Sequence, residues 1–171
     1  MLLLNDNKCI LIMKKIKILH WFVIALIAIY FVIFLSNIFL SVYTPDFMNF
    51  SDEFYSQFIF GYYTQFVGLA ISVVTFIALF FLKKGLLITI KNGFFNKNSS
   101  IKFKVTGQLL IISGTLSLLW SLVLLVYSEG KSLFIGIEAS ILLMLIGFSL
   151  LVLTSYIQNG SLLQQENDLT I

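Results

Sequence analysis

The sequence predicts an all-α membrane protein whose four transmembrane helices form an antiparallel bundle, with the N-terminus and the C-terminus both in the cytoplasm. The chain of 171 residues is 59% hydrophobic and only 11% charged, whereas about a quarter of the residues in a soluble domain are charged. Its apolar residues fall in four runs, each near the ~20 residues that a helix needs to cross a bilayer. Nearly all of its lysines lie to one side of these runs, which indicates a single orientation.

The four apolar runs predict spans over about 18–42, 58–82, 107–127 and 133–157, and none of them contains a lysine. The first run is too long for a signal peptide and ends without a small-x-small cleavage site. We therefore expect it to remain as a span, so that residues 18–157 form one membrane domain.

Three segments outside the spans are expected in the cytoplasm: an N-terminal segment 1–17, a loop 83–106 and a tail 158–171. The first two hold ten of the eleven lysines, and cytoplasmic segments of membrane proteins are enriched in basic residues. Met13, which two lysines follow directly, is an alternative start of translation.

Two outer connections carry further structural signals. The connection 128–132 is so short that the third and fourth spans are expected to pack side by side as an antiparallel pair. In the first outer loop, Ser51 precedes Asp52 and Glu53, the pattern of a helix N-cap with acidic residues in the first turn. We therefore expect the second helix to begin outside the membrane.

Small and polar residues recur along one side of the last three spans. Such stripes allow close approach of helices in lipid, and the alternative is a path for a polar substrate lined by Gln65, Ser72 and Thr75. The stripes comprise Gly61, Gln65, Gly68, Ser72 and Thr75 in the second span, Gly107, Gly114, Ser117 and Ser121 in the third, and Gly136, Ser140, Gly147 and Thr154 in the fourth.

The composition argues against several classes of function. One cysteine, Cys9, cannot form an internal disulfide, and one histidine, His20, cannot build a metal site without further ligands. All 11 basic residues are lysines, so the chain lacks the arginine fork that reads phosphates and base edges, and no direct nucleic-acid binding is expected. No pair of titratable groups is placed to share a site, so we expect no enzyme activity and no cofactor.

Glu138 is the only acidic residue within an apolar run. A carboxylate inside a membrane is a candidate for proton relay or cation contact. The alternative is a structural residue that reaches interfacial water or is buried in its protonated form.

The loop and the tail carry the remaining signals. Apolar residues alternate with lysines between Lys83 and Val105, which suits a segment that lies in the lipid headgroup layer. The tail contains Glu166 and Asp168 but no lysine. Its end is expected either to fray or to dock as an added strand on a partner.

Two short segments resemble a known family. The run Gly93-Phe94-Phe95-Asn96-Lys97-Asn98 and the ending Glu166-Asn167-Asp168-Leu169-Thr170-Ile171 are similar to those of the bacterial family called domain of unknown function 2975. The resemblance covers most of the chain after Met13 and departs at Asn159-Gly160-Ser161, where a more continuous helix is expected. It implies no catalytic residue, but it implies a gene next to that of a small helix-turn-helix transcription regulator.

The leading hypothesis is therefore a multi-pass protein of the bacterial inner membrane that is a non-enzymatic partner or sensor for a cytoplasmic helix-turn-helix regulator. The alternatives are a small transporter or channel subunit, with Glu138 and Gln65 as intramembrane polar residues, and an immunity-type protein against membrane-active peptides. Expected partners are the lipid bilayer, the regulator and other copies of the chain. The candidate docking residues are Gly93, Phe94, Phe95, Glu166, Asp168, Leu169, Thr170 and Ile171.

Overall fold

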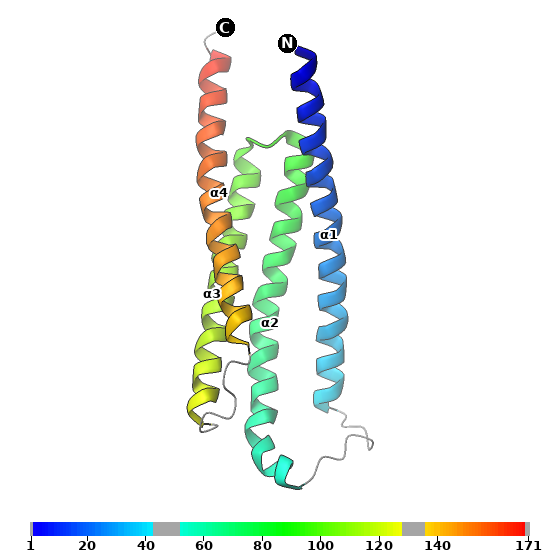
Figure 1. Ribbon diagram of the computed structural model, residues 1–171, viewed down its shortest axis with the longest axis vertical. Helices are drawn as coiled ribbons and strands as arrows, with labels where there is room; N and C mark the ends of the chain where they lie inside the picture. The colour runs from blue at the N-terminus through cyan, green and yellow to red at the C-terminus, as the bar shows by residue number, and fades with distance from the viewer. Residues whose placement is uncertain (1, 43–51, 128–135, 170–171) are drawn as a thin grey trace.

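The structure, a computed structural model, describes residues 2–42, 52–127 and 136–169, and every regular element in these ranges is an α-helix. Each helix is long and apolar enough to cross a membrane. The predicted all-α architecture with four membrane helices is therefore confirmed. The helices are α1 (Leu2–Val42), α2 (Asp52–Asn92), α3 (Lys97–Tyr127) and α4 (Ile137–Leu169) (Figure 1).

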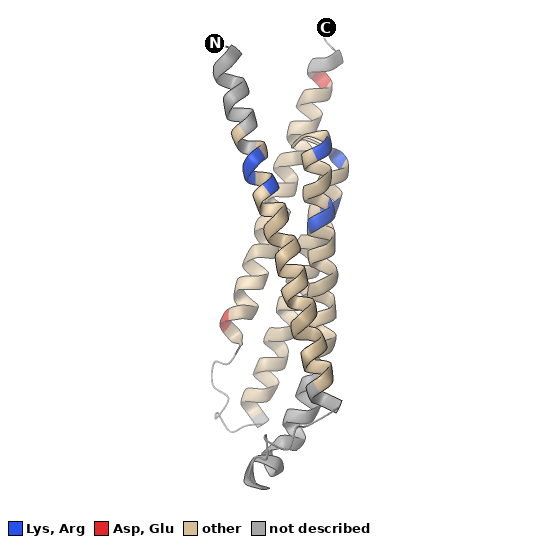
Figure 2. Cartoon of the chain, turned by 90° about the vertical axis from the view of Figure 1, so that its right-hand side faces the viewer, with Lys and Arg blue, Asp and Glu red and all other residues tan. Residues whose placement is uncertain are grey.

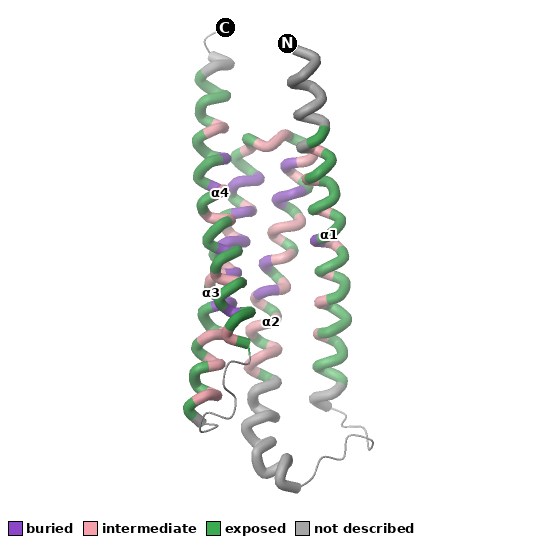
Figure 3. The backbone as a smooth tube through the Cα atoms, in the orientation of Figure 1, coloured by how far each residue is buried: buried purple, intermediate pink, exposed green. Residues whose placement is uncertain are grey.

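The four helices form an open row. Consecutive helices run in opposite directions, so that the first turn of α1 and the last turn of α4 lie at the same end of the molecule (Figure 1). Among the described residues, backbone contacts join α1 to α2, α2 to α3 and α3 to α4, and no other pair. A closed four-helix bundle would also bring the first helix against the last. Figure 3 shows the consequence: α1 is largely exposed and the buried positions concentrate on the other three helices.

Most of the segment 83–106, which we predicted to connect the second and third spans, is helical, because α2 continues to Asn92 and α3 already begins at Lys97. Both helices extend past the predicted spans and meet at a short turn. Leu86 and Phe103 are only 5% and 3% exposed. They pack between helices, so this segment forms a helical hairpin.

The turn between α2 and α3 is specified by a glycine and an asparagine. Gly93 has a φ of 87°, and its N–H donates to the carbonyl of Thr89 at 3.1 Å, which is the left-handed ending typical of helices. Asn96 then caps α3: its Oδ1 accepts from the N–H of Asn98 at 2.8 Å, and its carbonyl accepts from the Ser99 hydroxyl. Both residues belong to the segment that carries the family resemblance.

α2 begins before its predicted span, whereas α4 begins after the start of its predicted span. α2 begins at Asp52, well before its predicted span, as the N-cap pattern indicated; Ser51 itself lies outside the described residues. α4 begins only at Ile137, after Gly136 with a φ of 85°. The short connection 128–132 lies outside the described residues.

Glycine and serine bring α3 and α4 into close contact. A Cβ added to Gly107 would lie 2.7 Å from the carbonyl oxygen of Gly147, and one added to Gly114 would lie 2.8 Å from that of Ser140. The Ser140 hydroxyl donates to the Ser117 hydroxyl at 2.8 Å. The small-residue stripes of the third and fourth spans therefore form a helix interface, as one of the two interpretations predicted.

The interfaces of α2 with α1 and α3 contain hydroxyl and aromatic side chains. The hydroxyls of Thr75 and Ser113 share a buried hydrogen bond of 2.5 Å between α2 and α3. On the other side of α2, Tyr30 of α1 stacks on Phe76 at a centroid distance of 6.3 Å. Gly68 has no atom within 4 Å of an added Cβ, so it does not mediate close packing. Of the α2 stripe, Thr75 forms a hydrogen bond across an interface, and the side chain of Gln65 lies outside the described part of the chain.

The contact between Thr75 and Ser113 gives a first prediction. Thr75→Val and Ser113→Ala each remove one hydroxyl of a pair that is shielded from water. We expect a coupling free energy of about 0.6 kcal/mol, and at most about 1.7 kcal/mol, the range found for hydrogen bonds between membrane helices. A double-mutant cycle on reversible unfolding in mixed detergent measures it. Additive effects of the two substitutions would show that the hydroxyls do not hold the helices together.

Candidate functional site

The candidate site is the lysine-rich end of the molecule, defined here as the last turn of α4, the turn 93–96 and the helix ends beside them. The described lysines lie toward this end (Figure 2). They project from three of the four helices, whereas α4 contributes Glu166 near its end. The lysines are Lys14, Lys15 and Lys17 of α1, Lys83, Lys84 and Lys91 of α2, and Lys97, Lys102 and Lys104 of α3.

A cluster of buried apolar side chains packs the four helices together next to the lysine-rich end. It takes one residue from each helix, and Ile157 of α4 is fully buried within it. The ammonium of Lys102 lies 5.3 Å above the ring of Phe81, which adds a cation–π contact between α2 and α3. The cluster fixes the relative positions of the helices from which the candidate residues project. Its buried members are Val23, Leu86, Phe103 and Ile157.

The α2–α3 turn packs on the extension of α4 beyond the predicted span. The Phe95 ring lies so close to Gly160 that a Cβ on this glycine would overlap it. Nearby, the Ser100 hydroxyl donates to the carbonyl of Thr154 at 3.4 Å. The two segments that carry the family resemblance thus belong to elements that touch each other, although about sixty residues of sequence separate the contacting pair.

The two phenylalanines of the turn have different surroundings. Their rings meet edge to face at a centroid distance of 5.4 Å. Phe94 packs against the buried cluster, so its role is structural. Phe95 remains 49% exposed while it covers Gly160. Of the described residues in the turn, Phe95 therefore presents the largest apolar surface to the outside of the helix packing.

The tail is helical as far as the structure describes it. α4 continues without interruption through Gly160 to Leu169, so the described part of the tail is a helix, and the prediction that its end docks as an added strand on a partner remains a prediction. Glu166 is exposed on this helix. The side chains of Asp168 and Leu169, and the whole of Thr170 and Ile171, lie outside the described residues.

Glu138 lies in the first turn of α4, at the opposite end of this helix from the lysine-rich end. It is exposed in the first turn of α4, where a carboxylate is favoured by the helix dipole. α4 begins later than the predicted span, so Glu138 is closer to the start of its helix than the sequence indicated. The neighbouring helix α3 nevertheless extends well past the level of Glu138. Ser140 bonds to Ser117, and α3 continues from Ser117 to Tyr127, roughly 15 Å further at 1.5 Å per residue. The described residues contain no group of three or more potential metal ligands.

Sequence reasoning missed the contact between Phe95 and Gly160. The run Asn159-Gly160-Ser161 contains weak helix formers and departs from the family resemblance, which implies a more continuous helix, yet α4 continues through it. A glycine within a helix also provides a flat surface for an aromatic ring, so Gly160 could have been predicted as a contact position, although not its partner Phe95. Comparisons with family models, with curated proteins and with solved structures found no match.

Proposed function

We propose that this chain is a non-enzymatic protein of the bacterial inner membrane that holds, or senses for, a cytoplasmic helix-turn-helix regulator. The packing of Phe95 on Gly160 carries this proposal, because it joins the α2–α3 turn and the α4 extension into one helical surface. The link to a regulator comes from the resemblance to domain of unknown function 2975, which rests on residues 93–98 in the turn and residues 166–171 at the end of the tail.

The lysine distribution supports a cytoplasmic position for this surface. Basic residues are retained on the cytoplasmic side of membrane proteins, and the described lysines lie toward one end of the molecule. We infer that both termini are cytoplasmic and that the four helices cross the membrane as an antiparallel set. A soluble regulator would then have direct access to the turn and the tail.

The shape of the surface suggests how a partner binds. Leu163 follows Gly160 by three residues, which places it on the same side of α4 as the Phe95 contact. Leu163 is 61% exposed and Phe95 is 49% exposed. We propose that the two side chains form an apolar docking surface, bordered by the acidic tail. A partner would pack against a helix here instead of adding a strand.

Transport receives less support from the geometry. Thr75, Ser113, Ser117 and Ser140 are hydrogen-bonded to one another in pairs across helix interfaces. A hydroxyl that is engaged between two packed helices does not line an aqueous path. The transporter or channel alternative therefore rests only on the predicted position of the protein in the membrane. The immunity-type alternative rests on the same prediction.

Capture of the regulator tests the proposal. The full-length protein in detergent should retain the helix-turn-helix protein encoded beside its gene. Deletion of Glu166–Ile171, or Phe95→Ala, should lower recovery at least about tenfold if the apolar ring is an energetic anchor of the contact. Phe148→Ala is the matched control, because Phe148 is an exposed phenylalanine of α4 outside the lysine-rich end. If both the deletion and Phe95→Ala recover as much regulator as the unchanged protein does, this docking surface is excluded.

A further inference from the structure

One face of α3 changes character along its length. Lys97, Lys104, Gln108, Ile112 and Leu119 are all exposed, and their spacings of four and seven residues place them on one side of the helix. From the lysine-rich end inward, the side chains are therefore charged, then polar and uncharged, then apolar. A phospholipid has the same order: phosphate, ester groups and acyl chains.

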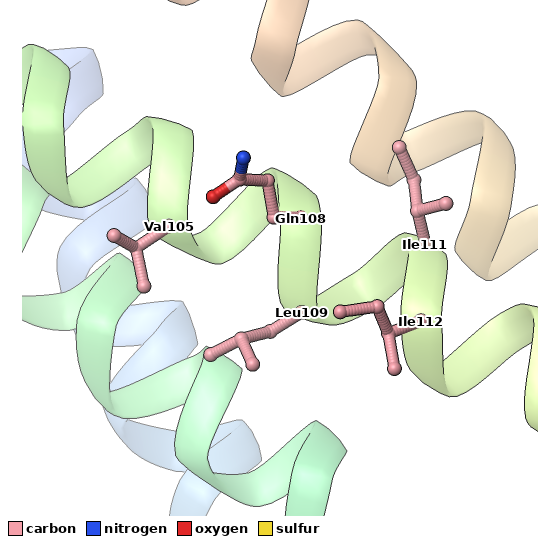
Figure 4. A pocket seen from close by; sticks show the side chains of 5 residues that line it. All are labelled: Val105, Gln108, Leu109, Ile111 and Ile112. Carbon is pink, nitrogen blue, oxygen red and sulfur yellow. The ribbon is translucent and has the colours of Figure 1, made fainter.

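Gln108, the uncharged polar residue on this face, lines a hollow in the surface of α3. The hollow has a volume of about 450 Å³ and is lined by Val105, Gln108, Leu109, Ile111 and Ile112. Figure 4 shows the Gln108 amide projecting from α3 among four aliphatic side chains. An amide in an apolar surrounding is costly unless it forms hydrogen bonds. The site therefore favours an occupant that presents a polar acceptor next to hydrocarbon.

A second apolar hollow lies further along the same helix, away from the lysine-rich end. It has a volume of about 620 Å³ and lies between α2 and α3. Trp120, which forms part of its wall, is roughly 18 Å along α3 from Gln108 at 1.5 Å per residue. One leaflet of a bilayer contributes about half of the ~30 Å hydrocarbon core. The two hollows together thus match the length of one acyl chain. The lining residues are Phe66, Val67, Ala70, Ile71, Val74, Leu116, Leu119, Trp120 and Val123.

We propose that this face of α3 binds one anionic phospholipid from the leaflet at the lysine-rich end. The Lys104 ammonium attracts the phosphate, the Gln108 amide N–H donates to an ester carbonyl, and an acyl chain lies along the two hollows. This site is separate from the docking surface of Phe95 and Leu163 and does not depend on the proposed regulator.

A second copy of the chain fits the same face less well. Two copies in one membrane share an orientation, so the axis of a two-fold contact would run along the membrane normal and hold both copies of each residue at the same depth. Both Lys104 ammonium groups would then lie at one level of the contact, where like charges repel. A lipid phosphate neutralises this charge instead.

Lipid retention tests the proposal. We expect native mass spectrometry of the full-length protein to show one bound phosphatidylglycerol after exchange from mixed phosphatidylglycerol and phosphatidylcholine micelles. Lys104→Gln should lower the bound fraction about fivefold, the effect expected for one lysine at an anionic surface. Gln108→Leu, which retains the apolar volume, should lower it by a similar factor.

Lys15→Gln is the control, because Lys15 is an exposed lysine of α1 and lies on a helix that does not contact α3. It should leave the bound fraction unchanged. Equal retention of phosphatidylcholine, or equal loss in all three variants, would overturn the proposal. A dimer that dissociates with Gln108→Leu would also overturn it and would identify the occupant as a second copy.

Discussion

Replacing Ile157 with alanine is expected to cause the largest loss of stability of any single side-chain truncation discussed here. The Ile157 side chain is fully buried where all four helices contribute to one cluster. Truncation leaves a cavity, and large-to-small changes at such positions cost about 2 to 4 kcal/mol. Reversible unfolding in mixed detergent measures the loss.

Ile141→Ala provides the matched control for this experiment. It removes the same atoms from the same helix, but at a position that is 50% exposed, so little packing is lost. We expect an effect well below that of Ile157→Ala. If the two substitutions cost the same, the cluster does not hold the lysine-rich end together.

Gly147→Ala is expected to push α3 and α4 apart. The added Cβ would lie 2.7 Å from the carbonyl oxygen of Gly107 and 2.8 Å from a side-chain carbon of Ile111. Because one of these atoms belongs to the backbone, the helices themselves must shift. Overpacking of this kind costs about 1 to 3 kcal/mol, which the same unfolding measurement detects.

Gly68→Ala separates this steric effect from the intrinsic effect of the substitution. Gly68 also lies within a membrane helix, but nothing is within 4 Å of an added Cβ. Because alanine favours a helix over glycine by about 1 kcal/mol, Gly68→Ala should be neutral or slightly stabilising. A similar loss from both substitutions would mean that Gly147 does not mediate a close helix contact.

The two predictions also bear on function, because both packing sites hold α4 in place. Gly147 contacts α3 within the membrane domain, and Ile157 is buried three residues before Gly160. The proposed docking surface needs α4 beside the α2–α3 turn. A variant that loosens α4 should therefore weaken capture of the regulator even though its exposed docking residues are unchanged.

Part of the candidate site was predictable from local sequence. Gly93 and Asn96 are common helix-stop and helix-start residues, and the structure uses them in those roles. The half-exposed Phe95 could not be assigned to Gly160 in the same way, because nothing in the sequence relates the register of the turn to that of α4. Gln108 was missed because an isolated amide at the edge of an apolar run carries no signal until its neighbours are placed.

The sequence by itself determined that the protein is helical and has four segments able to cross a membrane, because long uncharged runs can satisfy their backbone hydrogen bonds in lipid only as helices or closed barrels. The tertiary structure decided where the helices end beyond those runs and which faces meet. Water can satisfy the backbone there, so hydropathy no longer fixes the boundary. Packing does so instead: Leu86 and Phe103 are buried in a helical hairpin, and Phe95 covers Gly160 on a continuous α4.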